Sequence, residues 1–194
     1  MKRLSVCMLT ALLLAGCAGK SPKPDPHVYL LRAQPGLPDG LQAPPVEIGI
    51  SRVAVASYLA QQGIVVATTG DQVHAARQHL WAEPLDSAIR LFLQDAISAR
   101  LGYLVSADAA RRSSWDYRVD VRIDEWHGSL TGDVRIRASW TVFDGTKQQA
   151  RADYRFEQTA AMQSDGYDAL VAVQKDLLTA LADAIADSLR SLAS

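Results

Sequence analysis

The chain has 194 residues, of which 48% are hydrophobic, and it carries 20 Lys and Arg against 21 Asp and Glu. That length is enough for one domain with its own hydrophobic core. A charge balance this close to neutral, without a basic stripe, argues against nucleic-acid binding and against electrostatic attachment to a membrane.

The first sixteen residues have the layout of a secretory signal peptide. Lys2 and Arg3 precede an almost unbroken apolar run, Leu4–Ala15, which ends close to small residues. The run has roughly a dozen residues and is too short to span a bilayer, which takes about 20. Cys17 then stands where the bacterial lipobox has its acylated cysteine. We therefore predict a signal peptide at residues 1–16 and lipidation at Cys17; the alternative is an ordinary signal peptide followed by a chance cysteine.

Lipidation at Cys17 would fix the protein to a membrane face. Cys7 would leave with the signal peptide, so the exported domain would have no disulfide and would depend on packing alone. A diacylglycerol and an amide-linked chain together hold a protein far more firmly than one acyl chain does. Ala18 and Gly19 stand in place of the Asp that commonly retains bacterial lipoproteins at the inner membrane. We therefore expect an anchor in the outer membrane, on its periplasmic face.

Residues 17–27 are predicted to be a tether. Pro22, Pro24 and Pro26 alternate with polar residues, a pattern that favours extended chain over helix or sheet. The domain itself is expected at residues 28–194.

The first half of that domain predicts short strands. We expect strands at residues 27–31, 46–56, 64–67 and 72–81, with a surface excursion at residues 35–45. The alternation slips at Ser51 and Arg52, which indicates a bulge in the second of these strands.

Two long amphipathic helices are predicted from apolar residues spaced three and four apart. The first begins at Pro84, a residue tolerated at the first helical position, and ends before Gly102. The second begins after Ser164 or Asp165 and runs roughly 25 residues, with Leu170, Leu181 and Leu192 on its apolar stripe. Its polar face is rich in Asp, so packing on the core is favoured over lying on an anionic membrane surface.

Three successive segments, 117–124, 133–142 and 151–157, alternate strictly between apolar and polar residues. Such segments form a sheet with one apolar and one charged face. Asp144-Gly145 is a strong hairpin signal between the second and third, and residues 127–132 form a longer loop between the first and second. The expected fold class is α+β: a two-layer domain with an antiparallel-rich mixed sheet and both helices packed on its apolar face. The charged face fits either a solvated surface with cross-strand ion pairs or a docking surface for another subunit.

No catalytic, metal or cofactor site is predicted. His74 and His79 are five residues apart, unlike the four-residue step of a helical zinc pair, and the chain has no nucleophile elbow and no phosphate-binding loop. The tryptophans Trp81, Trp126 and Trp140 are expected in the core or at strand ends.

Four stretches carry a family resemblance. They are Val28–Leu31, Val53–Leu59, Ile64–Val66 and Trp81–Leu85, the last with the sequence Trp-Ala-Glu-Pro-Leu. Together they resemble the family of ABC-type transport auxiliary lipoproteins related to PqiC, and the layout is similar over nearly all of the chain after Cys17. The chain departs from the family pattern at Ala56, where a proline is common, and in the polar residues that follow Leu59.

The resemblance implies a non-enzymatic, outer-membrane lipoprotein subunit of a PqiABC-like lipid transport system that contributes to envelope integrity. Its implied partner is a PqiB-like MCE-domain protein that builds a periplasmic tunnel. Self-association, with a ring as one form, and contact with phospholipid are further expectations. Tyr58, Leu59 and Trp81 fall in the family-like stretches and are the candidate partner-binding residues.

Two alternatives stay open at this point. One is a structural or assembly lipoprotein of another envelope complex without lipid cargo. The other is a membrane-associated hydrolase, which would require a pocket that gathers a histidine with a serine or an aspartate.

Overall fold

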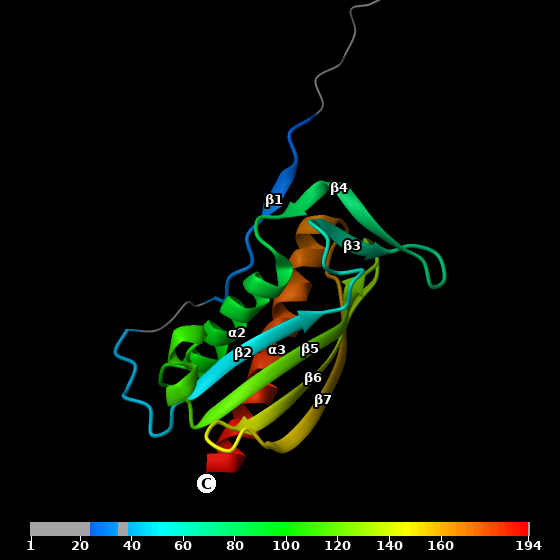
Figure 1. Cartoon of the computed structure of the whole chain (residues 1–194). Coiled ribbons are helices and arrows are strands. Elements are labelled where there is room, and N and C mark those ends of the chain that lie inside the picture. The colour runs from blue at the N-terminus through cyan, green and yellow to red at the C-terminus, as the bar shows by residue number, and fades with distance from the viewer. Residues whose placement is uncertain (1–23, 35–38, 194) are drawn as a thin grey trace, which may run out of the picture.

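The computed structural model describes residues 24–34 and 39–193, and it forms one mixed sheet covered by two helices (Figure 1). The sheet order is β1-β4-β3-β5-β6-β7, and β2 pairs with β5 beside this path. The elements are β1 (His27–Tyr29), β2 (Ile48–Val55), β3 (Gly63–Ala67), β4 (Val73–Trp81), α2 (Leu85–Leu101), the 3-10 helix η1 (Ala109–Ser114), β5 (Tyr117–Gly128), β6 (Asp133–Asp144), β7 (Ala150–Ala161) and α3 (Tyr167–Ala193).

This architecture confirms the predicted α+β class. In the part of the chain that the structure describes, no helix has the length and apolarity needed to cross a bilayer. The predicted signal peptide, Cys17 and most of the predicted tether lie outside the described residues.

Strand β5 is the centre of the sheet. One of its edges pairs with β6 over its whole length, in antiparallel fashion. Its other edge pairs in parallel with β2 from Tyr117 to Ile123 and with β3 at Gly128. The antiparallel meander β5-β6-β7 was predicted and is confirmed.

A bulge in β5 explains why this strand extends beyond its predicted end. Ile123 pairs with Ala138 and Glu125 with Arg137, so Asp124 is the extra residue. Beyond the bulge the alternation has shifted by one position, and Trp126 points into the core with 1% of its surface exposed. His127 and Gly128 therefore belong to β5, and the loop that follows is shorter than predicted.

The connection between β6 and β7 is a hairpin, as predicted, but it is longer than a two-residue Asp-Gly turn. Asp144 ends β6, and its Oδ1 accepts hydrogen bonds from the backbone N–H of Thr146 (3.1 Å) and Lys147 (2.9 Å). The hydroxyl of Thr146 donates to the same oxygen at 2.7 Å and is the main cause of the lowered pKa of Asp144. Asp144 thus stabilises a loop of five residues before β7 begins at Ala150.

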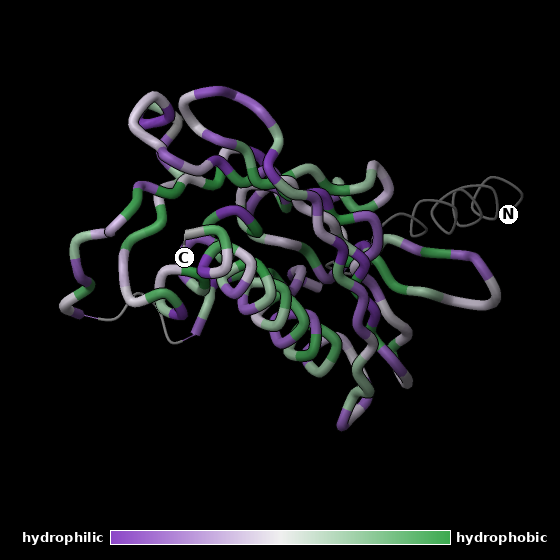
Figure 2. The backbone as a smooth tube through the Cα atoms, turned by 90° about the horizontal axis from the view of Figure 1, so that it is seen from below, coloured by the Kyte–Doolittle hydropathy of each residue, from purple (hydrophilic) through white to green (hydrophobic). Residues whose placement is uncertain are grey.

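Both helices cover the apolar face of the sheet, as expected. Helix α2 packs on β2, α3 packs on β5, β6 and β7, and the two helices pack on each other. Pro84 is the N-cap of α2 rather than its first helical residue, and Gly102 ends the helix in the predicted left-handed conformation (φ 82°). In α3, hydrophobic and hydrophilic residues alternate along the turns (Figure 2).

Two tryptophans join α3 to the sheet by hydrogen bonds inside the core. The indole N–H of Trp126 donates to the carbonyl of Gln174, and that of Trp140 donates to the hydroxyl of Ser188, both at 3.1 Å. Since an unpaired buried N–H is costly, each bond fixes how α3 lies on the strands. The predicted core position of Trp81, Trp126 and Trp140 is confirmed.

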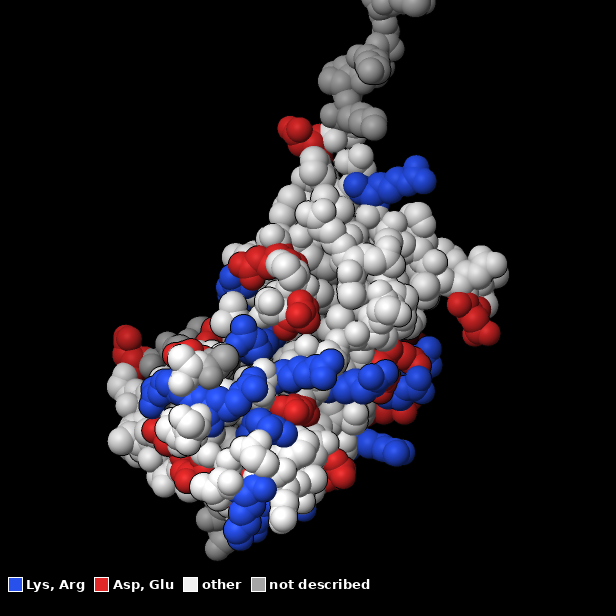
Figure 3. Space-filling view, in the orientation of Figure 1, with Lys and Arg blue, Asp and Glu red and all other residues white. Residues whose placement is uncertain are grey.

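Charge is distributed unevenly over the face of the molecule that Figure 3 shows. Lys, Arg, Asp and Glu gather over the lower part of the view, on the polar face of β2 and the meander. Here Glu125 on β5 binds both Arg135 and Arg137 on β6, which supports the interpretation of a solvated face with cross-strand ion pairs. Few charges lie on the opposite part, the upper end, which we define as β1, β3, β4 and the segments 57–62 and 81–86.

Candidate functional site

At the upper end, the family-like stretch that begins at Trp81 meets the loop 60–62, which follows another such stretch. The backbone N–H of Trp81 donates to the carbonyl of Gln62 at 2.8 Å, which ties the start of one stretch to the loop that follows the other. The indole of Trp81 stacks on that of Trp126, with ring centroids 5.4 Å apart and planes 17° apart. The loop 60–62 and the segment leading into α2 are thereby fixed on the stacked indoles of Trp81 and Trp126.

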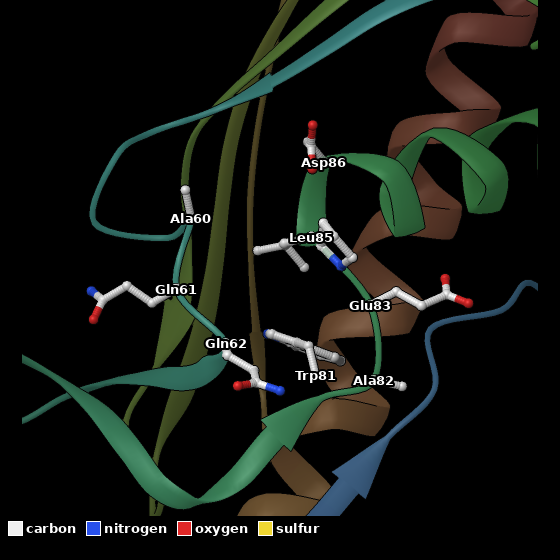
Figure 4. Close-up of a pocket in the computed structure, with 9 residues that line it drawn as sticks. Ala60, Gln61, Gln62, Trp81, Ala82, Glu83, Leu85 and Asp86 are labelled. Carbon is white, nitrogen blue, oxygen red and sulfur yellow. The ribbon is translucent and has the colours of Figure 1, made fainter.

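A cavity of about 330 Å³ lies between residues 60–62 and residues 81–86 (Figure 4). Trp81 and Leu85 point toward it and form an apolar floor, each with no more than 5% of its surface exposed. The lining residues are Ala60, Gln61, Gln62, Trp81, Ala82, Glu83, Pro84, Leu85 and Asp86. An apolar floor within a polar rim, at the lower end of the size range of ligand pockets, suits a partner's apolar side chain.

One wall of the cavity is fixed by an ion pair. The guanidinium of Arg32 donates to both carboxylate oxygens of Glu83, at 2.6 and 3.0 Å. This bond to Arg32 is the main reason why the pKa of Glu83 lies below its ordinary value. Because Arg32 follows β1, the pair connects the chain that enters the domain with the segment that opens α2.

The three predicted partner-binding residues do not share one surface. Leu59 is buried with 2% of its surface exposed, and Trp81 is the floor of the cavity. Half-buried Tyr58 turns the other way: its hydroxyl lies 2.9 Å from Nδ1 of His127 and donates to the carbonyl of Asp124 at 3.3 Å. Core packing alone explains the burial of Leu59 and of the indole of Trp81. Contact of any of the three residues with a partner stays a prediction.

Tyr58 belongs to a second hollow, of about 410 Å³, between the β3–β4 hairpin and the polar face of the meander. His127, Glu125, Arg135 and Arg137 are among its lining residues. Burial lowers the pKa of His127 and raises that of Tyr58. This hollow is polar, and its Glu125 is already paired with Arg135 and Arg137, in contrast to the apolar floor of the first cavity.

A cluster of polar and aromatic side chains fixes β1, the first strand of the domain, against β4 and the start of α3. The hydroxyl of Tyr29 on β1 donates to Oδ1 of Asp168 at 2.8 Å and lies 2.9 Å from Nδ1 of His79. The imidazole of His79 stacks on Tyr167 at 3.7 Å. Burial, followed by the bond to Asp168, raises the pKa of Tyr29 to about 12. This cluster could not be predicted from the sequence, because it depends on parallel pairing of β1 with β4, some fifty residues away.

In the described residues, no histidine is placed to activate a serine as a nucleophile. His79 and His127 each have a tyrosine hydroxyl at Nδ1, and neither is hydrogen-bonded to a serine. His127 does line a hollow with Asp124 and Glu125, but the nitrogen facing Tyr58 is occupied. Within residues 24–34 and 39–193, no group of three or more His, Cys, Asp or Glu could hold a metal ion.

Comparison with known proteins gives consistent matches in sequence and in structure. Residues 29–186 match the model of the family described as ABC-type transport auxiliary lipoprotein component. The intermembrane transport lipoprotein PqiC of Escherichia coli (strain K12) is 29% identical over 188 residues, which cover 95% of this chain and 96% of PqiC. PqiC of Shigella flexneri matches to the same extent.

Two solved structures share the fold. An uncharacterised protein is 26% identical, with a TM-score of 0.71 over 86% of this chain and 99% of its own. Protein XCC0632 from Xanthomonas campestris is 13% identical, with a TM-score of 0.66 over 82% of this chain and 91% of its own.

Proposed function

The chain belongs to the family of ABC-type transport auxiliary lipoprotein components, and from this membership we propose that it is an outer-membrane-anchored subunit of a PqiABC-like lipid transport system. The observation that carries the proposal is the similarity to PqiC, an intermembrane transport lipoprotein, at 29% identity over 95% of the chain. The role is non-enzymatic, and it contributes to the integrity of the envelope.

Three parts of the chain have separate tasks in this proposal. Cys17 carries the lipid anchor in the outer membrane, on the periplasmic side. The segment up to His27 spaces the domain from the bilayer. The domain receives a PqiB-like MCE-domain tunnel protein and associates with further copies of itself, with a ring as one form.

The cavity at the upper end is the proposed docking point for the MCE-domain partner. It combines an apolar floor, Trp81 and Leu85, with the exposed residues Gln61 and Gln62 at its rim. Because interface energy concentrates where apolar side chains enter well-packed pockets, one partner side chain seated on this floor would contribute disproportionately to binding. Tyr58 and Leu59 support the position of the loop that forms the rim.

Co-purification from crosslinked cells tests the proposal. We expect the full-length protein to recover an MCE-domain protein and to sediment with the outer membrane. Cys17→Ala removes the acylated residue and should release the protein from the membrane fraction. Recovery of no MCE-domain protein by the wild-type chain would contradict the proposed function.

The size of the cavity favours a second candidate, an assembly lipoprotein without lipid cargo. A space of about 330 Å³ suits a side chain better than a two-chain lipid. The lipid composition of the two membranes in a deletion strain separates these roles. A changed phospholipid distribution supports transport, and an unchanged one supports assembly alone.

A further inference from the structure

The walls of the cavity at the upper end carry charge of one sign. Among the described residues, those that line the cavity include the acids Glu83 and Asp86 but no Lys, Arg or His. The other lining residues are apolar or uncharged. A cavity with carboxylates and without cations attracts a positively charged group and repels a negatively charged one. Charge therefore restricts what can enter this cavity, in addition to its apolar floor.

The two carboxylates differ in whether they are already paired. Both oxygens of Glu83 accept hydrogen bonds from Arg32, and the Glu83 side chain points away from the floor (Figure 4). Asp86 is exposed in the first turn of α2 and has no ion-pair or hydrogen-bond partner among the described residues. The dipole of α2 favours an acid at this position but gives its carboxylate no bonded partner. The charge that is free to meet a ligand is that of Asp86.

The uncharged part of the rim supplies further hydrogen-bond acceptors. The side-chain nitrogen of Gln61 donates to the carbonyl of Tyr58 at 2.7 Å, which leaves the amide oxygen available. The side chain of Gln62 has no hydrogen-bond partner among the described residues. Amide oxygens accept hydrogen bonds from an ammonium or a guanidinium group, both of which are donors only. The rim thus suits a cation in its hydrogen bonding as well as in its charge.

We propose that the cavity binds the side chain of an arginine or lysine of the MCE-domain partner. The aliphatic stem of that side chain lies on Trp81 and Leu85, and its charged end meets Asp86. Long basic side chains ordinarily place their methylene groups on apolar surface and keep the charged end in a polar environment. An uncharged side chain would leave Asp86 unpaired, and an acidic one would be repelled by it.

The proposed function underlies this assignment, because the assignment names the chemistry of the partner at the docking point. It narrows the occupant of the cavity to a side chain with an apolar stem and a cationic end. It also makes Asp86 the residue that selects the partner by charge, since specificity comes from repelling the wrong partner as well as from attracting the right one.

Titration of the full-length protein in detergent with N-acetylarginine amide, followed by NMR, tests the site without the partner. We expect saturable shifts confined to residues 60–62 and 81–86, and much weaker binding of uncharged N-acetylnorleucine amide. Asp86→Asn should raise the dissociation constant about two- to fivefold, as expected for one exposed ion pair. Asp71→Asn removes a charge from an exposed position between β3 and β4 and should leave the constant unchanged. Equal binding of the two amides, or no shifts at these residues, would overturn the proposal.

Charge reversal tests the same site with the partner, in co-purification from crosslinked cells. Asp86→Lys should reduce recovery of an MCE-domain protein about tenfold or more, because like charges would meet. Gln62→Lys adds a cation from the other wall without changing α2 and should have the same direction of effect. Asp71→Lys is the matched control and should leave recovery intact.

The two measurements separate failure of this assignment from failure of the proposed function. Undiminished recovery in either folded variant, Asp86→Lys or Gln62→Lys, would overturn the basic occupant and leave the transport role in place. A wild-type chain that binds the arginine amide but recovers no MCE-domain protein would contradict the proposed function and leave the cation site in place.

Discussion

The meander and the upper end of this molecule are built on different principles. In the meander, strands that follow one another in the sequence pair with one another, and their charges are matched across the strands. In the upper end, β3 and β4 also form a hairpin, but β1 pairs with β4 and β3 pairs with β5 over separations of fifty residues or more. The upper end also has few charges and contains the cavity with the apolar floor.

The difference indicates that one region mainly stabilises the fold and that the other is available for binding. The meander and the two helices bury most of the apolar surface, and burial of that surface is the main source of stability. The upper end holds family-like stretches on that base and contains the cavity that we propose as the docking point. Changes in the meander should therefore reduce the free energy of unfolding, and changes at the cavity rim should reduce partner binding instead.

Trp140→Ala should have the largest effect on stability. It removes a core indole with 4% exposure, its stacking on Tyr154 and its hydrogen bond to Ser188. The expected loss is about 3–5 kcal/mol, because a large buried side chain leaves a cavity behind. Denaturant unfolding followed by circular dichroism measures it. Arg52→Ala, at an exposed position, is the control, with an expected change within about 0.5 kcal/mol. Equal effects of the two substitutions would contradict the account.

Gly49→Ala should have the second largest effect. A Cβ at Gly49 would lie 2.0 Å from a ring carbon of Trp115, a side chain with 2% exposure. Overpacking of this kind costs about 1–3 kcal/mol, measured again by denaturant unfolding. At Gly132 the Cβ would meet only the hydroxyl of Ser129, at 2.7 Å, which can rotate away. Gly132→Ala should therefore cost less than Gly49→Ala, and a larger cost would show that the contact with Trp115 is not the cause.

Acidification should weaken the junction between the two regions. Burial lowers the pKa of His127, and burial followed by the charge of His27 lowers that of His79. The unfolded chain then binds protons at pH values where the folded chain resists them. The free energy of unfolding should fall as the pH drops below about 6.5, the ordinary value for histidine. Unfolding at a series of pH values measures this slope. His127→Gln should flatten it, and an unchanged slope would exclude His127 as a contributor.

Ala60→Arg should have the smallest effect on stability. Ala60 is exposed at the rim of the cavity, so the substitution removes no core packing. It places a charge over the apolar floor and should abolish most of the recovery of an MCE-domain protein in co-purification. Ala110→Arg makes the same change at an exposed alanine on η1 and should leave recovery intact. A stable Ala60→Arg protein with full recovery would place docking elsewhere.

The same contrast explains which parts of the structure could be predicted from the sequence. The helices and the meander follow from local periodicity and short connections, so their existence, their faces and their order were accessible. The end of β5 was missed because the bulge at Asp124 interrupts the alternation on which the prediction relied. The long loop after Asp144 was missed because the Asp-Gly signal does not specify how many residues the aspartate can cap.

The cavity and the cluster around Tyr29 could not be predicted: the cluster depends on pairing of β1 with the distant β4, and the cavity depends on how the two ends of the β3–β4 hairpin pack above Trp126. Nothing local to Trp81 indicates that its N–H will bond to Gln62, or that its ring will stack on Trp126. The family resemblance marked the stretch Trp81–Leu85, but only the fold shows that it lines one cavity together with residues 60–62.

The central claim is that this lipoprotein family member meets its MCE-domain partner through the upper end. Site-specific photocrosslinking in cells tests it most directly, with a crosslinking residue at Gln61 on the cavity rim or at Arg52 on the charged face of the sheet. The account predicts an adduct with an MCE-domain protein from position 61 and none from position 52. An adduct from position 52 alone, or from neither position, would contradict it.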